Sequence, residues 1–215
     1  DLVVGVLFRR GIEFAYRVAD RFRQVVVAVA AQRQAWESVF SSDLVLGVSL
    51  SATQFAMPNL VAELRQVLEQ HGLRPQQLEV EVTEEALTQN LDDTRKQLRL
   101  LRELGVRVAL DDFGSGSCCL AYLRDLQLDT LKLDRHLIAR LLTSPRDAAI
   151  ARSVIDLCKQ FGLLVIAEGV ETLEQYEWLK ANGCEYVQGF LVARPLTASS
   201  ASQFAQPFDW SALPA

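Results

Sequence analysis

The sequence predicts an α/β protein, built as a TIM-like (β/α)8 barrel that lacks its first strand or is trimmed there. Short apolar runs alternate with amphipathic stretches along the chain, and repeated βα units predict a parallel sheet. Some runs, such as residues 163–167, carry no polar residue, which fits a strand covered on both faces. An open doubly wound sheet is the alternative, although the chain has no Gly-x-Gly-x-x-Gly turn typical of dinucleotide-binding folds.

Apolar runs and alternating patterns give a strand for every position of such a barrel but one. The predicted strands are residues 3–8, 44–50, 78–82, 106–110, 130–133, 163–167 and 186–188. We expect the strand missing from this set to lie upstream of Asp1 or to have been lost.

Helical spacing of apolar residues fills the segments between the strands. The predicted helices are residues 22–40, 59–72, 98–105, 120–126, 146–161 and 172–182. Asn59 is expected to cap one of them, and Gly72 and Gly105 are expected to end two of them, because glycine favours helix ends. Residues 1–215 are expected to form one domain, with a loosely specified Ala- and Ser-rich tail after about residue 197.

The overall charge and the cysteine pattern narrow the class of protein. A net charge of −5 argues against a nucleic-acid binder, which needs a basic face. The four cysteines have no metal-like Cys-x-x-Cys spacing, and the longest apolar run, residues 25–31, is too short to cross a membrane. We therefore expect a cytoplasmic location, either for a whole protein or for the cytoplasmic part of a larger one.

Polar residues gather where the predicted strands end. Asp111 and Asp112 follow the strand 106–110 directly, and two adjacent carboxylates are costly unless a cation compensates them. The other strand ends carry Ser49, Glu81, Glu84, Lys132, Asp134, Glu168, Glu171 and Gln188. In a barrel these ends meet at one rim, so the pattern indicates metal-assisted phosphodiester chemistry or the binding of a phosphate ligand. With only two histidines in the chain, the metal would be oxygen-bound, hence Mg²⁺ or Mn²⁺.

Five segments, in this order, resemble the motifs of the EAL family, the cyclic di-GMP phosphodiesterase domains of bacteria. They are residues 78–84 (LEVEVTE), 111–116 (DDFGSG), 131–135 (LKLDR), 167–172 (AEGVET) and 183–190 (GCEYVQGF). The resemblance implies a TIM-like barrel. It also implies that active members hold two Mg²⁺ or Mn²⁺ ions, which activate a water that cuts one phosphodiester bond.

The resemblance further implies a role for each matching residue. Glu81, Asp111 and Asp112 would bind metal, Lys132 would assist the water, and Glu168 would be a metal ligand or base. The remaining positions are Gln188, which would support the site, Glu171, which would lie near the ligand, and Glu84. Glu84 would brace the loop after Asp112, a loop that commonly lies at a dimer interface in the family.

Two departures from the family pattern concern expected metal ligands. The family's Glu-x-Leu-x-Arg pattern aligns with residues 5–9, where Leu7 and Arg9 are kept but Gly5 replaces the glutamate. A two-residue deletion after Val6 aligns about as well and also leaves no glutamate. Ser49 stands where the family has a metal-binding asparagine. Glycine has no side-chain ligand, and a serine hydroxyl is a poor one for a hard cation.

These losses favour a degenerate EAL domain that binds cyclic di-GMP as a receptor, with little or no hydrolysis, and signals through a partner protein or attached domains. The expected ligand contacts are Leu7, Arg9, Asp112, Glu171 and Gln188. Two alternatives stay open: an active phosphodiesterase that uses Mg²⁺ or Mn²⁺ with Lys132 and Glu168 as catalytic residues, and an interaction module without nucleotide. The sequence does not decide whether the domain needs a metal when inactive, or whether it forms a homodimer.

Overall fold

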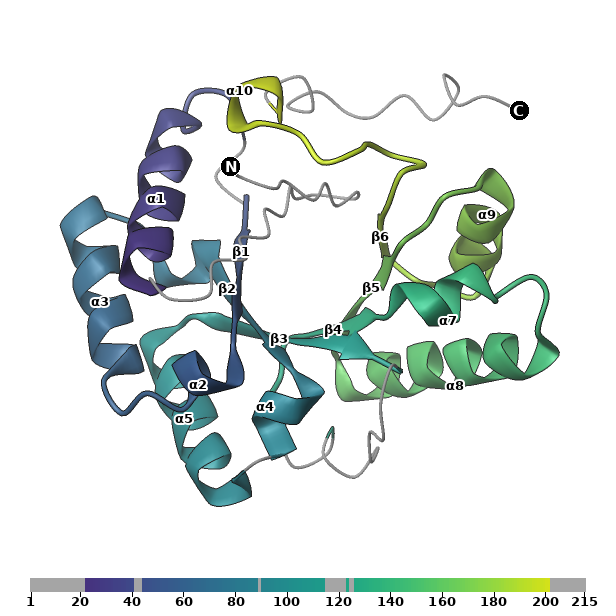
Figure 1. Ribbon diagram of the computed structural model, residues 1–215, viewed down its shortest axis with the longest axis horizontal. Coiled ribbons are helices and arrows are strands. Elements are labelled where there is room, and N and C mark those ends of the chain that lie inside the picture. Colours follow the sequence, from purple (N-terminus) through teal and green to yellow (C-terminus); the bar gives the residue numbers. More distant parts are fainter. Residues whose placement is uncertain (1–21, 41–43, 89, 115–122, 124–125, 202–215) are drawn as a thin grey trace.

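The structure, a computed structural model, describes residues 22–40, 44–88, 90–114, 123 and 126–201. Within these ranges, one six-stranded parallel sheet follows the order of the chain. Its strands are β1 (Leu46–Leu50), β2 (Leu78–Thr83), β3 (Arg107–Phe113), β4 (Thr130–Leu133), β5 (Leu164–Glu168) and β6 (Tyr186–Gln188). The sheet curls, and helices cover its outer side (Figure 1). The predicted strand 3–8 lies outside the described residues. The other predicted strands are confirmed within one or two residues at each end, except that β3 continues to Phe113, three residues past the predicted end at residue 110.

Helices connect the strands as a (β/α) barrel requires. They are α1 (Phe22–Ala35), α2 (Ala52–Phe55), α3 (Leu60–His71), α4 (Glu84–Thr88), α5 (Leu91–Leu104), α7 (Arg135–Ala139), α8 (Pro145–Phe161), α9 (Leu173–Ala181) and α10 (Ala198–Ala201), with a 3₁₀ turn at Pro75–Gln77. None of the helices in the described ranges is long and apolar enough to span a membrane. Most of the predicted helix 120–126 lies outside the described residues.

The first helix ends earlier than the sequence pattern predicts. Residues 36–40 form turns, in which the Phe40 N–H still donates to the Trp36 carbonyl at 2.9 Å. The two aromatic rings pack edge to face with centroids 5.3 Å apart, and both are buried. The turns after α1 bury Trp36 and Phe40, so the helical spacing of apolar residues extends past the end of the helix.

Helix ends test the capping predictions. Gly72 and Gly105 adopt left-handed φ values of 61° and 90° at the ends of α3 and α5, as predicted. Asn59 precedes α3 as expected, but its side chain makes no capping hydrogen bond and instead donates to Glu63. The reason is its backbone, since φ −99° and ψ 4° differ from the extended conformation of a capping residue.

Strand register brings the polar residues to one edge of the sheet. In β2 the apolar residues 78, 80 and 82 alternate with Glu79 and Glu81, and both sets are buried. Glu81 is the register partner of Ser49 on β1, and Gln188 on β6 is the partner of Glu168 on β5. Glu79 and Glu81 of β2 contact side chains of β4 across the intervening β3. These glutamates must therefore project into the concave interior of the curled sheet.

Candidate functional site

Lys132 lies at the centre of the predicted site. Its side chain is only 2% exposed, and Nζ lies 2.7 Å from Glu168 Oε1, 3.1 Å from Glu81 Oε1 and 3.7 Å from Asp111 Oδ1. A buried ammonium is costly unless carboxylates compensate it, and here strands β2, β3 and β5 each supply one. The structure thus brings together residues separated widely in sequence, as the strand-end argument predicts.

Glu81 is held from two sides at the bottom of the site. Its side chain is 1% exposed. The hydroxyl of Ser49 donates to Oε2 at 2.6 Å from the neighbouring strand, while Lys132 forms the ion pair at Oε1. The Ser49 hydroxyl therefore binds Glu81 directly.

The two aspartates reach the same side of the sheet through an irregular backbone. Consecutive strand residues normally point to opposite faces. Asp112, however, has a φ of 58° and is the only non-glycine residue with a positive φ in the described ranges, and the β3–β4 register shifts between Leu110 and Phe113. The Asp112 N–H also donates to Asp111 Oδ1 at 3.0 Å. As a result, carboxylate oxygens of Asp111, Asp112 and Glu168 lie within 4.8 Å of one another.

This carboxylate cluster favours a bound positive charge. Burial raises the pKa of Asp111 to about 7; Lys132 opposes this rise, and the carboxylates of Glu81, Glu168 and Asp112 add to it. Three carboxylates that converge on one point are the donor set that hard divalent cations such as Mg²⁺ and Mn²⁺ prefer. The residues present therefore fit a divalent cation at Asp111, Asp112 and Glu168.

The remaining predicted residues take different places. Gln188 Oε1 is buried at the end of β6 and has no hydrogen-bond partner among the described residues. Glu171 is exposed just beyond β5, and Glu84 begins α4, where burial raises its pKa.

Asp134 caps α7 by accepting the His136 N–H at 2.8 Å, which gives that strand-end carboxylate a structural role. Gly5, Leu7 and Arg9 lie outside the described residues, as does the loop that Glu84 was expected to brace.

Sequence reasoning missed Glu79. Its carboxylate accepts the Thr130 hydroxyl at 2.6 Å, and both side chains are buried. Burial raises the pKa of Glu79 to about 7, against the hydrogen bond from Thr130. The signal was present in the strand pattern, because Glu79 alternates in phase with Glu81 and must face the same interior.

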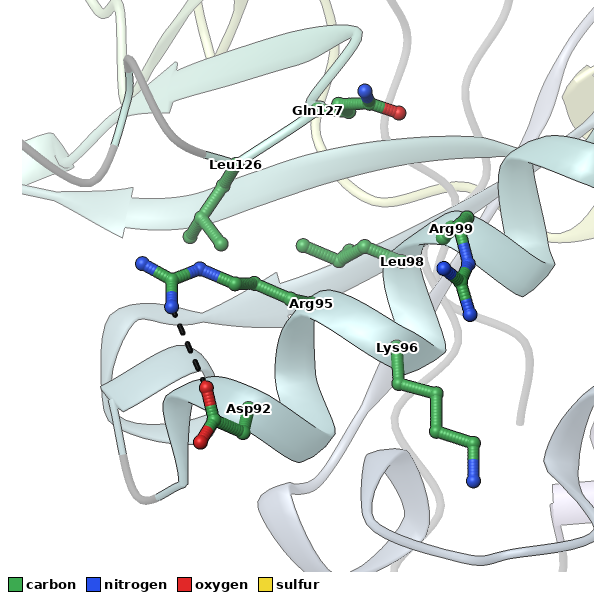
Figure 2. Close-up of a pocket in the computed structure, with 7 residues that line it drawn as sticks. All are labelled: Asp92, Arg95, Lys96, Leu98, Arg99, Leu126 and Gln127. Atoms are coloured by element: carbon green, nitrogen blue, oxygen red, sulfur yellow. Dashed lines mark hydrogen bonds and ion pairs between the residues drawn. The ribbon is translucent and has the colours of Figure 1, made fainter.

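A cavity of about 400 Å³ lies away from these carboxylates, along α5 (Figure 2). Arg95 points toward Asp92 at its edge, with Nη1 3.5 Å from Oδ1, and Leu126 lies above the Arg95 stem. The other residues that line the cavity are Lys96, Leu98, Arg99 and Gln127. None of the predicted site residues lines this cavity, so the candidate site is the carboxylate cluster in the sheet interior.

Comparison with known proteins decides the family. The family model described as the EAL domain matches residues 15–195, which include all five motifs. The chain belongs to the EAL domain family. The cluster around Lys132 therefore lies at the strand ends of an EAL barrel.

Individual relatives agree with this assignment. The chain is 45% identical over 169 residues to the cyclic di-GMP phosphodiesterase NbdA of Pseudomonas aeruginosa, covering 79% of this chain and 22% of that protein. The PaMucR phosphodiesterase, solved as a c-di-GMP complex, superposes with a TM-score of 0.85 at 31% identity, covering 93% of each chain. Klebsiella pneumoniae BlrP1, solved with manganese and cyclic di-GMP, gives 0.81 at 29% identity over 92% of this chain and 56% of that one.

The matched relatives are much longer than this chain. It spans about a fifth to a quarter of the length of the curated proteins that it matches, including NbdA at 22% and the bifunctional diguanylate cyclase/phosphodiesterase MucR at 24%. The solved structures confirm the predicted TIM-like fold.

Proposed function

We propose that this EAL domain binds cyclic di-GMP as a receptor and hydrolyses it slowly or not at all. The observation that carries the proposal is the hydrogen bond from Ser49 to Glu81, at 2.6 Å. Positions 49 and 81 are both expected to bind metal, and here their side chains bind each other instead. Gly5, at the signature position, offers no side-chain ligand either. Efficient hydrolysis depends on the geometry of the bound metals, so losing these ligands weakens catalysis first.

Ligand binding depends on a different set of groups. Asp112 lies near the end of β3, Glu171 follows β5 and Gln188 ends β6. Leu7 and Arg9 are kept in the signature segment of the sequence. The buried Gln188 oxygen without a partner is a group that a ligand or ordered water could satisfy. A bound Mg²⁺ or Mn²⁺ at Asp111, Asp112 and Glu168 would offset their charge beside an anionic phosphodiester. Complexes of PaMucR and BlrP1 with cyclic di-GMP support the same ligand for this chain.

The test is calorimetric binding of cyclic di-GMP beside a hydrolysis assay with Mg²⁺ and with Mn²⁺. The proposal expects micromolar or tighter binding with turnover to the linear dinucleotide far below that of NbdA measured in parallel. Rapid turnover would contradict the receptor function. Failure to bind cyclic di-GMP would instead favour an interaction module that uses no nucleotide.

An active phosphodiesterase is the second candidate, favoured by the intact arrangement of Lys132, Asp111 and Glu168. In this case Lys132 would help to hold the attacking water and Glu168 would bind metal or accept its proton, with other groups replacing the missing ligands. The double variant Gly5→Glu/Ser49→Asn separates the candidates. A large gain in rate supports the receptor reading of the natural chain, whereas a high rate left unchanged supports the active enzyme.

The curated relatives suggest the setting in which such a receptor works. Since the chain covers about a quarter or less of those proteins, we infer that attached domains or a partner protein read its ligand state in the cytoplasm. Homodimerisation through the segment after Asp112 is part of the same proposal.

A further inference from the structure

The carboxylates of the site divide into two groups by depth and by the hydrogen bond from Ser49, while Lys132 contacts members of both groups. Glu81 lies deepest, at 1% exposure, with Ser49 at Oε2 and Lys132 at Oε1. Asp111, Asp112 and Glu168 lie nearer the surface, and their oxygens lie within 4.8 Å of one another. Glu81 is not a member of this convergent group.

The chemistry of Ser49 accounts for the division. A serine hydroxyl is a hydrogen-bond donor, and here it donates to the Glu81 carboxylate at 2.6 Å, a short charge-assisted hydrogen bond. An asparagine at this position could instead present a carbonyl oxygen, which repels a nearby carboxylate unless a cation lies between them. The hydroxyl therefore removes the need for a cation between positions 49 and 81.

Lys132 completes the compensation of Glu81 without a metal. Its buried ammonium lies 3.1 Å from Oε1, so the second carboxylate oxygen also faces a positive group. For a cation to bind Glu81, it would have to displace both the hydroxyl and the ammonium from a pocket that water hardly reaches. Gly5, at the signature position of the sequence, has no side-chain ligand that would help it to do so.

We propose that Ser49 and Lys132 together withdraw Glu81 from metal binding, so that this domain holds one divalent cation, at Asp111, Asp112 and Glu168, where the family resemblance implies two. The inference goes beyond the proposed receptor function, since it concerns the number of cations and needs no nucleotide. It would hold even if cyclic di-GMP failed to bind.

The experiment titrates the nucleotide-free protein with Mn²⁺ and follows free and bound ion by electron paramagnetic resonance. The natural chain should bind one Mn²⁺ per chain and show the spectrum of an isolated ion. The double variant Gly5→Glu/Ser49→Asn should bind two and show exchange coupling, because paired metals in such sites lie about 3.5–4 Å apart. Two ions in the natural chain, or none, would overturn the proposal.

Two further variants guard against trivial explanations. Glu81→Gln should keep one bound Mn²⁺ per chain, because Glu81 is not its ligand; loss of the ion would contradict the proposal. Ser153→Asn, on the exposed face of α8 where the Ser153 hydroxyl bonds only to the Ala149 carbonyl, is the matched serine-to-asparagine control. A second ion in this control would show that the change at Ser49 is not the cause, and would overturn the assignment.

Discussion

At the scale of single residues, the site depends on one buried ammonium. Lys132 is 2% exposed and lies within 4 Å of Glu81, Asp111 and Glu168. Carboxylates that share a buried space repel one another and lose hydration, so the lysine stabilises the fold when no metal is bound. The role proposed for Lys132 in ligand chemistry therefore depends on the same ion pairs as its role in stability.

Substituting Lys132 by methionine should expose this dual role. The Lys132→Met variant keeps the stem but leaves buried carboxylates uncompensated, so we expect a loss of about 3 kcal/mol in the free energy of unfolding in EDTA. Millimolar Mn²⁺ should restore part of that loss by binding Asp111, Asp112 and Glu168. Urea denaturation with EDTA and with Mn²⁺ measures both effects, and equal stability of the variant and the natural chain in EDTA would contradict them.

Glu79 makes the stability of the domain depend on pH. Burial raises the pKa of Glu79 to about 7 from an ordinary value near 4.5, so the folded state holds its proton more tightly than the unfolded chain does. This contribution to stability is present below about pH 4.5 and is lost as the pH rises to about 7. Glu79→Gln removes the titration and keeps an oxygen for the Thr130 hydroxyl.

The natural chain should therefore lose stability relative to Glu79→Gln between about pH 4.5 and 7, by about 3 kcal/mol at most. Denaturation of both proteins in EDTA across this range gives the difference curve. The companion variant is Thr130→Val, which removes the hydroxyl that donates a hydrogen bond to Glu79. It should shift the pH range of the stability loss upward. A difference that stays flat from pH 4.5 to 8 would show that Glu79 titrates normally.

At the scale of elements, the connection after β6 holds Gln188 in place. The Val170 N–H donates to the Gln188 carbonyl, and the Leu191 N–H donates to the Val170 carbonyl, both at 3.0 Å. A Cβ added at Gly189 would lie 2.1 Å from the Val170 carbonyl oxygen. Only glycine lets the segments after β5 and β6 approach this closely.

Gly189→Ala should accordingly destabilise the domain by about 2 kcal/mol or more and weaken ligand binding through Gln188. Gly162→Ala is the matched control, because Gly162 also has a positive φ, of 72°, but a Cβ there meets nothing within 4 Å. Thermal or urea unfolding should show the smaller loss for Gly162→Ala. Equal losses in the two variants would mean that backbone conformation, and not the contact with Val170, sets the cost.

Particular elements show what the sequence could and could not reveal. Apolar runs, such as residues 163–167, and the alternation in β2 predicted the six strands. The strand-end rule predicted that Lys132 would meet Glu81, Asp111 and Glu168. The sequence could not show that Asp112 turns to the same side as Asp111, because alternation along a strand predicts opposite faces. Nor could it show the bond from Ser49 to Glu81, which depends on register between strands.

At the scale of the whole molecule, the curled sheet converts separate motifs into one compartment. The structure brings strand ends from residues 49 to 188 together, and the EAL family model matches residues 15–195 across them. We propose that this compartment binds cyclic di-GMP and a single cation but rarely cuts the nucleotide. The identity of attached domains would then determine what the binding event controls.

A crystal structure of the natural chain soaked with cyclic di-GMP and Mn²⁺ tests this claim most directly. We expect intact cyclic di-GMP at the strand ends and one anomalous Mn²⁺ peak, bound by Asp111, Asp112 and Glu168, with Glu81 still held by Ser49. Two Mn²⁺ peaks with Glu81 as a ligand, or a linear dinucleotide in the site, would contradict it.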